Sequence, residues 1–210
     1  MKKSPILFVK NLSNGSGELE ALKEVWILHW INITPYATKK FFIHTFCDAG
    51  RDAYTAVSYL VQEGDDKNVH FLASRSRIAP LKGAMIPRLE LLSALVRGRL
   101  TKSIVDVLGW TTVKCFYWSH STNVLKWITK EENWSVFVNN RVQEIRKISQ
   151  PSSWRNVSGV ENQADLPSRG RKASYLVKTR FWEGLRCFIS FQDKGPYNDF
   201  KLDEDEILKK

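Results

Sequence analysis

The stretch from Phe41 to Leu60 constrains the fold of this chain most, because it predicts a β-hairpin with a carboxylate at the end of its first strand. Two β-prone runs, 41–47 and 54–61, flank a short polar turn, and Asp48 follows the first run. An ionised acid at the end of an apolar strand is costly unless it is hydrogen-bonded, paired or bound to a metal. Asp48 is therefore either a turn cap that accepts backbone hydrogen bonds or a member of a site.

The segments after the hairpin predict an α/β domain with a five-stranded mixed sheet and helices on its faces. A third strand over 69–78 continues the hairpin as an antiparallel meander. Two later strands, 113–118 and 154–158, alternate with helices, which indicates parallel pairing. The longest helix, 87–108, is predicted by apolar residues that recur every three or four positions: Leu89, Leu92, Val96, Leu100, Ile104 and Val107.

Local signals place Glu90 near the start of that long helix. Pro87 suits the first helical turn, so Glu90 is expected in that turn, and Gly109 is expected to end the helix. The helix dipole favours an acid in the first turn, which is one explanation of Glu90. The other is that the helix presents Glu90 toward Asp48. Ser121 is expected to cap a short helix, and 136–148 forms another amphipathic helix.

Charge favours a polyanionic partner. Lysine and arginine outnumber the acids 32 to 22, a net charge of +10. The summed field attracts polyanions, with nucleic acid the first candidate, and a basic protein without such a partner is the alternative.

Three separated cysteines without a CxxC pair predict neither a zinc module nor a disulfide framework. The apolar run 6–9 is too short for a signal peptide or a membrane span. We expect an intracellular protein, cytoplasmic or nuclear, without a membrane partner.

Six segments of the chain together resemble one family. They are FCDA (46–49), SRIAPLK (76–82), PRLEL (87–91), YWSHST with VLKWI (117–128), NRVQEI (140–145) and ENQADLPSRG (161–170). In this order they resemble the ribonuclease H region of the polyproteins of Pao/BEL-type LTR retrotransposons. The resemblance implies a ribonuclease H-like five-stranded mixed sheet, which agrees with the element order. It also implies a nuclease that hydrolyses RNA in RNA–DNA hybrids.

The resemblance further implies a site of four acids that bind two Mg²⁺ or Mn²⁺ ions. Asp48, Glu90 and Asp165 match three of the acids, whereas the fourth position is His120. In such sites two ions about 3.5–4 Å apart activate water and stabilise the leaving oxygen. Mg²⁺ prefers oxygen ligands in an octahedron, and imidazole suits other metals better. We therefore predict poor Mg²⁺ occupancy and an impaired, weak or inactive nuclease.

His120 has other interpretations. It could be a structural histidine at a strand end, a ligand of a softer metal, or a lone general base. Cys115 lies five residues earlier, so on a regular strand the two side chains face opposite sides, which argues against a joint site.

Basic residues near the proposed site in sequence are candidates for phosphate contacts. Ordinary solvated basic loops are the alternative. A hybrid would be recognised by its shape and 2′-hydroxyls rather than by base sequence. The candidates are Arg75, Arg77, Lys82, Arg88, Arg169, Arg171 and Lys172.

The expected organisation has three parts. Residues 1–39 are a linker and helix that remain from an upstream polyprotein region, 40–170 form the ribonuclease H-like domain, and 171–210 are a helical extension with an acidic tail. Other retroelement polyprotein domains are expected partners.

Two other functions stay open: a non-catalytic nucleic-acid-binding or scaffold module, and an aspartic-type peptidase built on the turn Asp48–Gly50. The peptidase is disfavoured because it needs two carboxylates that share one proton.

Overall fold

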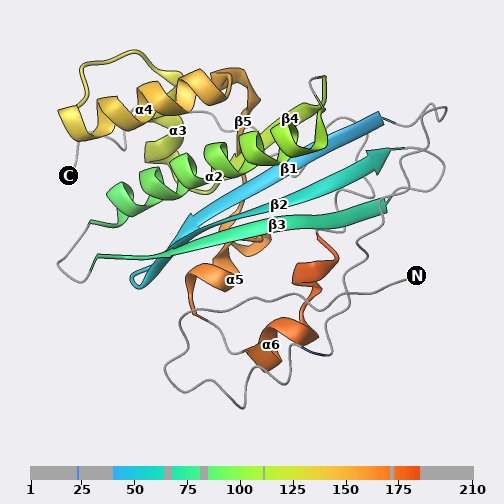
Figure 1. Cartoon of the computed structure of the whole chain (residues 1–210). Coiled ribbons are helices and arrows are strands. Elements are labelled where there is room, and N and C mark those ends of the chain that lie inside the picture. The colour runs from blue at the N-terminus through green and yellow to red at the C-terminus, as the bar shows by residue number, and fades with distance from the viewer. Residues whose placement is uncertain are drawn as a thin grey trace.

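A computed structural model describes residues 23, 40–63, 68–80, 85–110, 112–170 and 173–184. Apart from Lys23, the predicted N-terminal helix lies outside these residues, as does the acidic tail. Five strands form one sheet in the order β3-β2-β1-β4-β5 (Figure 1). They are β1 (Lys40–Ala49), β2 (Ala53–Glu63), β3 (Asn68–Ile78), β4 (Lys114–Ser119) and β5 (Trp154–Asn156). The first three strands pair antiparallel, and β4 and β5 join in parallel, which confirms the predicted mixed sheet.

The hairpin is longer than the sequence indicated. Pairing of β1 with β2 continues from Lys40 opposite Glu63 to Ala49 opposite Tyr54. Asp48 is thus a strand residue opposite Thr55, not a residue of the turn, so the turn-cap interpretation is wrong. Gly50 closes the turn with a 2.8 Å hydrogen bond from its N–H to the carbonyl oxygen of Ala53.

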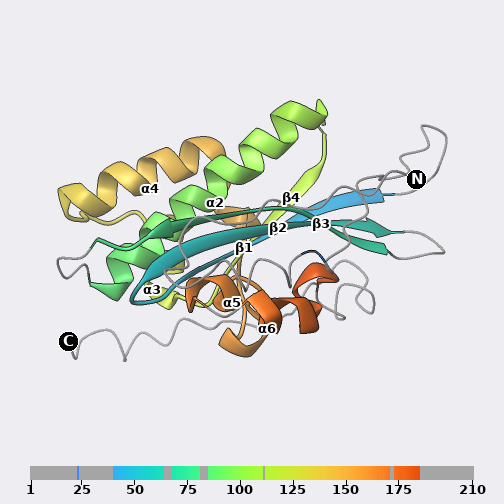
Figure 2. The same ribbon diagram turned by 60° about the horizontal axis from the view of Figure 1, so that its bottom comes forward.

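Helices cover both faces of the sheet (Figure 2). One face carries α2 (Ile86–Leu108), α3 (Thr122–Thr129) and α4 (Val136–Ile148), whose apolar residues form a core cluster with Cys47 and Tyr117 of the sheet. The other face carries α5 (Asp165–Ser168), α6 (Ala173–Lys178) and the short turn η4 (Arg180–Trp182). Phe46 faces that side while its neighbour Cys47 faces the first, as strand alternation requires.

Two helix boundaries follow from local residues. Gly109 adopts φ 65° and ends α2 as predicted, since glycine enters the left-handed region without a Cβ penalty. The Ser121 hydroxyl accepts a 3.4 Å hydrogen bond from the N–H of Val124, which confirms the predicted cap of α3. Because α2 begins at Ile86, Glu90 lies beyond its first turn, and the helix dipole does not explain this acid.

The segment after α6 packs against the second face of the sheet. Tyr59 donates a 2.6 Å hydrogen bond to the carbonyl oxygen of Phe181, and the Phe181 ring lies 5.6 Å from that of Phe71. Phe181 is buried in the same cluster as Phe46. A predicted domain boundary after residue 170 remains a prediction, but residues 173–184 contribute to the core. None of the helices in the described part of the chain has the length and hydrophobicity that a membrane span requires.

Candidate functional site

Asp48 lies near the end of β1 with its carboxylate buried. Oδ2 accepts a short hydrogen bond from the Ser168 hydroxyl. Oδ1 lies 3.3 Å from the side-chain nitrogen of Asn162 and 3.0 Å from Nδ1 of His120. Asn162 and Ser168 belong to the segment after β5, more than 110 residues away along the chain. The carboxylate is therefore satisfied by three side chains that the fold brings to the end of β1.

Glu90 reaches the same place from α2. Its Oε2 accepts a 2.6 Å hydrogen bond from Ser121, and its Oε1 lies 3.5 Å from Nε2 of His120. Burial raises the pKa of Glu90, and the Ser121 hydroxyl and His120 oppose that rise. The fully buried Arg97, two helical turns further along α2, donates a 2.6 Å hydrogen bond to the carbonyl oxygen of Trp118. This bond holds α2 against the end of β4, where His120 follows.

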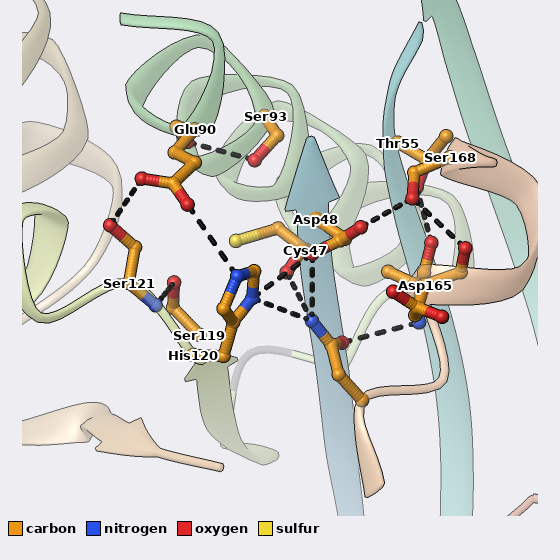
Figure 3. A network of polar contacts seen from close by, with 12 residues as sticks. Cys47, Asp48, Thr55, Glu90, Ser93, Ser119, His120, Ser121, Asp165 and Ser168 are labelled. Carbon is orange, nitrogen blue, oxygen red and sulfur yellow. Dashed lines mark hydrogen bonds and ion pairs between the residues drawn. The ribbon is translucent and has the colours of Figure 1, made fainter. Parts of the chain in front are cut away.

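His120 lies between the two carboxylates, with one ring nitrogen toward each (Figure 3). The amide of Asn162 has a fixed orientation, because its oxygen accepts from the N–H of Ala164 at 3.2 Å. Its side-chain nitrogen donates to the carbonyl oxygen of Cys47, 3.0 Å away, and lies 3.3 Å from Oδ1 of Asp48. The same nitrogen lies 3.2 Å from Nδ1 of His120, so this ring nitrogen has both Asn162 and Asp48 within hydrogen-bond distance.

The surroundings of His120 favour its protonated form. A carboxylate oxygen lies near each ring nitrogen, and a doubly protonated ring can donate to both. The hydrogen bond to Asp48 raises the pKa of His120 most; burial opposes it, and the charges of Asp48, Glu90 and Asp165 add to the rise. In its protonated form, His120 neutralises part of the negative charge of the cluster.

Asp165 begins α5, and its carboxylate pairs with Arg169 at 2.7 Å. Its carbonyl oxygen lies 2.9 Å from the Ser168 hydroxyl that donates to Asp48. In Figure 3 Asp165 is on the Ser168 side of Asp48, away from Glu90. The structure therefore brings three of the four predicted site residues, Asp48, Glu90 and His120, into direct contact, and it leaves Asp165 as a neighbour that faces an arginine.

The donor set does not fit two Mg²⁺ ions as it stands. The Asp48 and Glu90 oxygens are occupied by hydroxyl, amide and imidazole donors, and His120 fills the space between them. Within the described part of the chain, no group of three or more His, Cys, Asp or Glu side chains is arranged to hold a metal ion. Hard divalent ions need free oxygen ligands, whereas the oxygens here already accept from neutral or positive groups.

Several residues of this cluster were missed by the sequence analysis. Asn162 and Ser168 stand in the segment ENQADLPSRG, yet nothing in their local pattern separates them from ordinary turn residues. Ser121 was predicted only as a cap, and its hydroxyl also donates to Glu90. The resemblance of that segment to a family motif was the only available signal.

The predicted phosphate contacts are only partly described. Arg75 and Arg77 are exposed near the end of β3, and Arg88 is exposed at the start of α2. Arg169 is exposed and pairs with Asp165. Lys82, Arg171 and Lys172 lie outside the described residues. Contact of these side chains with nucleic acid stays a prediction.

Comparisons with known proteins agree with the family resemblance. The family model described as "Pao retrotransposon-like RNaseH-like domain" matches residues 9–121, a range that includes Asp48, Glu90 and His120. The comparison with curated proteins gave no match.

Solved structures that match the backbone of this chain include several RNases H. RNase H1 from the halophilic archaeon Halobacterium salinarum is 12% identical, with 60% of this chain and 90% of that chain covered and a TM-score of 0.39. The N-terminal RNase H domain of a Mycobacterium tuberculosis protein is also 12% identical, with 67% of this chain and 96% of that chain covered and a TM-score of 0.40. The compost-derived LC11-RNase H1 in complex with an RNA/DNA hybrid is 12% identical, with 59% of this chain and 88% of that chain covered and a TM-score of 0.39. With the strand order and the match over more than half of its length, the chain belongs to the Pao retrotransposon-like RNaseH-like domain family and has the RNase H-like fold.

Proposed function

We propose that this chain is a retroelement-derived domain for the metal-dependent hydrolysis of RNA in RNA–DNA hybrids, and that the hydrolysis is impaired by His120. The observation that carries the proposal is the position of the imidazole, 3.0 Å from Asp48 and 3.5 Å from Glu90. A two-metal phosphodiester hydrolysis requires divalent cations among such carboxylates. In this chain the imidazole of His120 lies between these carboxylates, and it offers neither a water to activate nor a Lewis acid for the leaving oxygen.

The experiment is cleavage of an end-labelled RNA–DNA hybrid by the purified chain in Mg²⁺ and, separately, in Mn²⁺. His120→Asp restores the fourth acid, and Asp48→Asn removes a central one at nearly constant volume. We expect cleavage by His120→Asp only, and none after Asp48→Asn is added to it. Equal rates for the natural chain and His120→Asp would show that His120 does not impair the nuclease.

A non-catalytic nucleic-acid-binding module is the second candidate. It is favoured by the net charge of +10. It is also favoured by the acid cluster, that is Asp48 and Glu90 with His120, because side chains of the protein itself already donate to both carboxylates. Hybrid binding that persists in a chain with Asp48→Asn and Glu90→Gln, without cleavage by any variant in either metal, would support it over the nuclease. The peptidase alternative gains no support, because the titratable side chain that directly contacts Asp48 is a histidine and not a second acid.

A further inference from the structure

Two arginines outside the acid cluster share one aromatic ring. The guanidinium carbon of Arg141, on α4, lies 3.8 Å from the centroid of the Phe137 ring, and that of Arg88, on α2, lies 5.1 Å from it. Both distances are within the range of cation–π attraction. The pair joins two helices that lie side by side on one face of the sheet (Figures 1 and 2).

This arginine pair has no acidic partner among the described residues. Other arginines of the same face do: Arg99 bonds Glu144 at 2.7 Å, and Arg146 lies 3.7 Å from Glu131. Two guanidinium groups on one ring without a carboxylate repel each other, so the arrangement favours an anion that lies between or beside them.

The ring is a rigid platform for the pair. Phe137 is half-buried and packs against the core cluster of α2, α3 and α4. Arg141 is held further, because its Nη1 donates a 3.1 Å hydrogen bond to the carbonyl oxygen of Phe137. A guanidinium that stacks on a ring keeps its remaining N–H groups at its edge, where they can donate to an anion. Little side-chain freedom is then lost when the anion binds.

The position of the pair fits a long polyanion better than a small ion. Arg88 is two residues before Glu90 on α2, and both α2 and α4 begin on the side of the molecule where β1 ends (Figure 1). The same side holds the acid cluster. A nucleic-acid strand that reaches the cluster can therefore extend to the arginine pair.

We propose that Arg88 and Arg141, held on Phe137, bind a backbone phosphate of a nucleic acid whose neighbouring nucleotides lie at the acid cluster. The inference rests on the proposed function, since it needs nucleic acid at that cluster. Arginine edges match phosphate oxygens in a two-pronged geometry, and phosphate contacts fix the register of a strand without reading its sequence.

The test is binding of a fluorescently labelled RNA–DNA hybrid, followed by anisotropy from about 50 to 200 mM salt, the range in which phosphate contacts lose affinity. The test variant is Arg88→Gln with Arg141→Gln. The matched control is Arg99→Gln, which removes an exposed arginine of α2 that already has an acidic partner. Phe137→Leu keeps apolar contact with the core and removes the ring face. Thermal unfolding followed by circular dichroism checks that each variant folds.

We expect the double variant to bind at least about fivefold more weakly at low salt, with the slope of log K against log salt reduced by about one. Phe137→Leu should fall between the double variant and the natural chain, and Arg99→Gln should match the natural chain. If the natural chain binds hybrid and the double variant binds it equally well, the arginine pair is not a phosphate site, although the proposed function stands. If the natural chain binds no hybrid, both proposals are wrong. Competition by polyglutamate as strong as that by a nucleic acid of equal charge would also overturn a phosphate site.

Discussion

Asn162 joins three parts of the acid cluster, although it is not one of the titratable groups. Its amide oxygen accepts from the N–H of Ala164. Its nitrogen donates to the carbonyl oxygen of Cys47 and lies within hydrogen-bond distance of Asp48 and of Nδ1 of His120. At the residue scale, one neutral amide therefore joins the segment after β5 to β1 and to the histidine that follows β4.

We predict that Asn162→Ala destabilises the protein by about 1–3 kcal/mol, since it leaves buried acceptors without their donor. Urea unfolding at neutral pH measures this change. Asn139→Ala, an exposed asparagine of α4, is the control and should change stability by less than about 0.5 kcal/mol. Equal effects of the two substitutions would mean that the amide of Asn162 is not a structural donor.

A second histidine gives the protein a predictable acid sensitivity. Burial lowers the pKa of His44 to about 3, and its Nδ1 accepts a 3.1 Å hydrogen bond from Trp118 Nε1. In the unfolded chain the pKa of histidine is about 6.5. Between these values the unfolded state binds a proton that the folded state does not. The contribution of His44 to stability is thus present above pH 6.5 and is lost as pH falls toward 3.

We predict that His44→Gln, which keeps an acceptor but does not titrate, has a shallower loss of stability between pH 6.5 and 4. For one proton, the slopes of unfolding free energy against pH of the variant and the natural chain should differ by up to about 1.4 kcal/mol per pH unit. Free energies of unfolding from urea titrations at several pH values give both slopes. Parallel curves for the two proteins would show that His44 is accessible to protons in the fold.

At the scale of elements, the turn after η4 depends on a glycine for two reasons. Gly184 adopts φ 76°, and a Cβ on it would lie 2.6 Å from a methyl carbon of Val69 and 3.3 Å from the ring of Tyr59. The first feature is a backbone preference, and the second is a packing constraint from β2 and β3. Together they allow the chain to turn close to the sheet after Phe181 has entered the core.

Gly109 separates the two effects, because it has φ 65° but no atom within 4 Å of its Cβ position. We predict that Gly109→Ala costs about 1 kcal/mol from backbone strain alone. Gly184→Ala should cost at least about 1 kcal/mol more, since the half-buried Val69 side chain must also move. Thermal unfolding of the two variants provides the comparison. A smaller loss for Gly184→Ala than for Gly109→Ala would mean that the segment does not pack on the sheet.

Element order was accessible from the sequence because its signals are local. Apolar periodicity predicted α2 and α4, Gly109 and Ser121 predicted two helix boundaries, and the hairpin predicted the antiparallel part of the sheet. The exact strand ends were less accessible: Ala49 belongs to β1 only because β2 continues to pair with it. Glu90 was placed in a first helical turn because the helix was expected to begin at Pro87 rather than at Ile86.

At the scale of the whole molecule, the acid cluster joins residues from four distant parts of the chain. Asp48, Glu90 and His120 could be named in advance from a family resemblance, and the structure brings them together. Ser121, Asn162 and Ser168 could not be named, since a polar residue in a turn has no local pattern that reveals a partner more than 110 residues away. The arginine pair was half predicted: Arg88 was named as a candidate phosphate contact, whereas Arg141 was not, because its position on the Phe137 ring beside Arg88 depends on helix packing.

The central claim is that protein donors, His120 among them, already occupy the carboxylates of Asp48 and Glu90, so that the natural chain does not bind Mg²⁺ there. The Mg²⁺ dependence of thermal unfolding tests this claim most directly. The natural chain and His120→Asp are melted in EDTA and in increasing Mg²⁺. We expect the melting temperature of the natural chain to stay constant, because the His120 ring already lies between Asp48 and Glu90. His120→Asp should melt lower in EDTA, since it places a third acid in the cluster, and Mg²⁺ should raise its melting temperature as bound ligand stabilises the folded state. A rise in the natural chain equal to that in His120→Asp would contradict the claim.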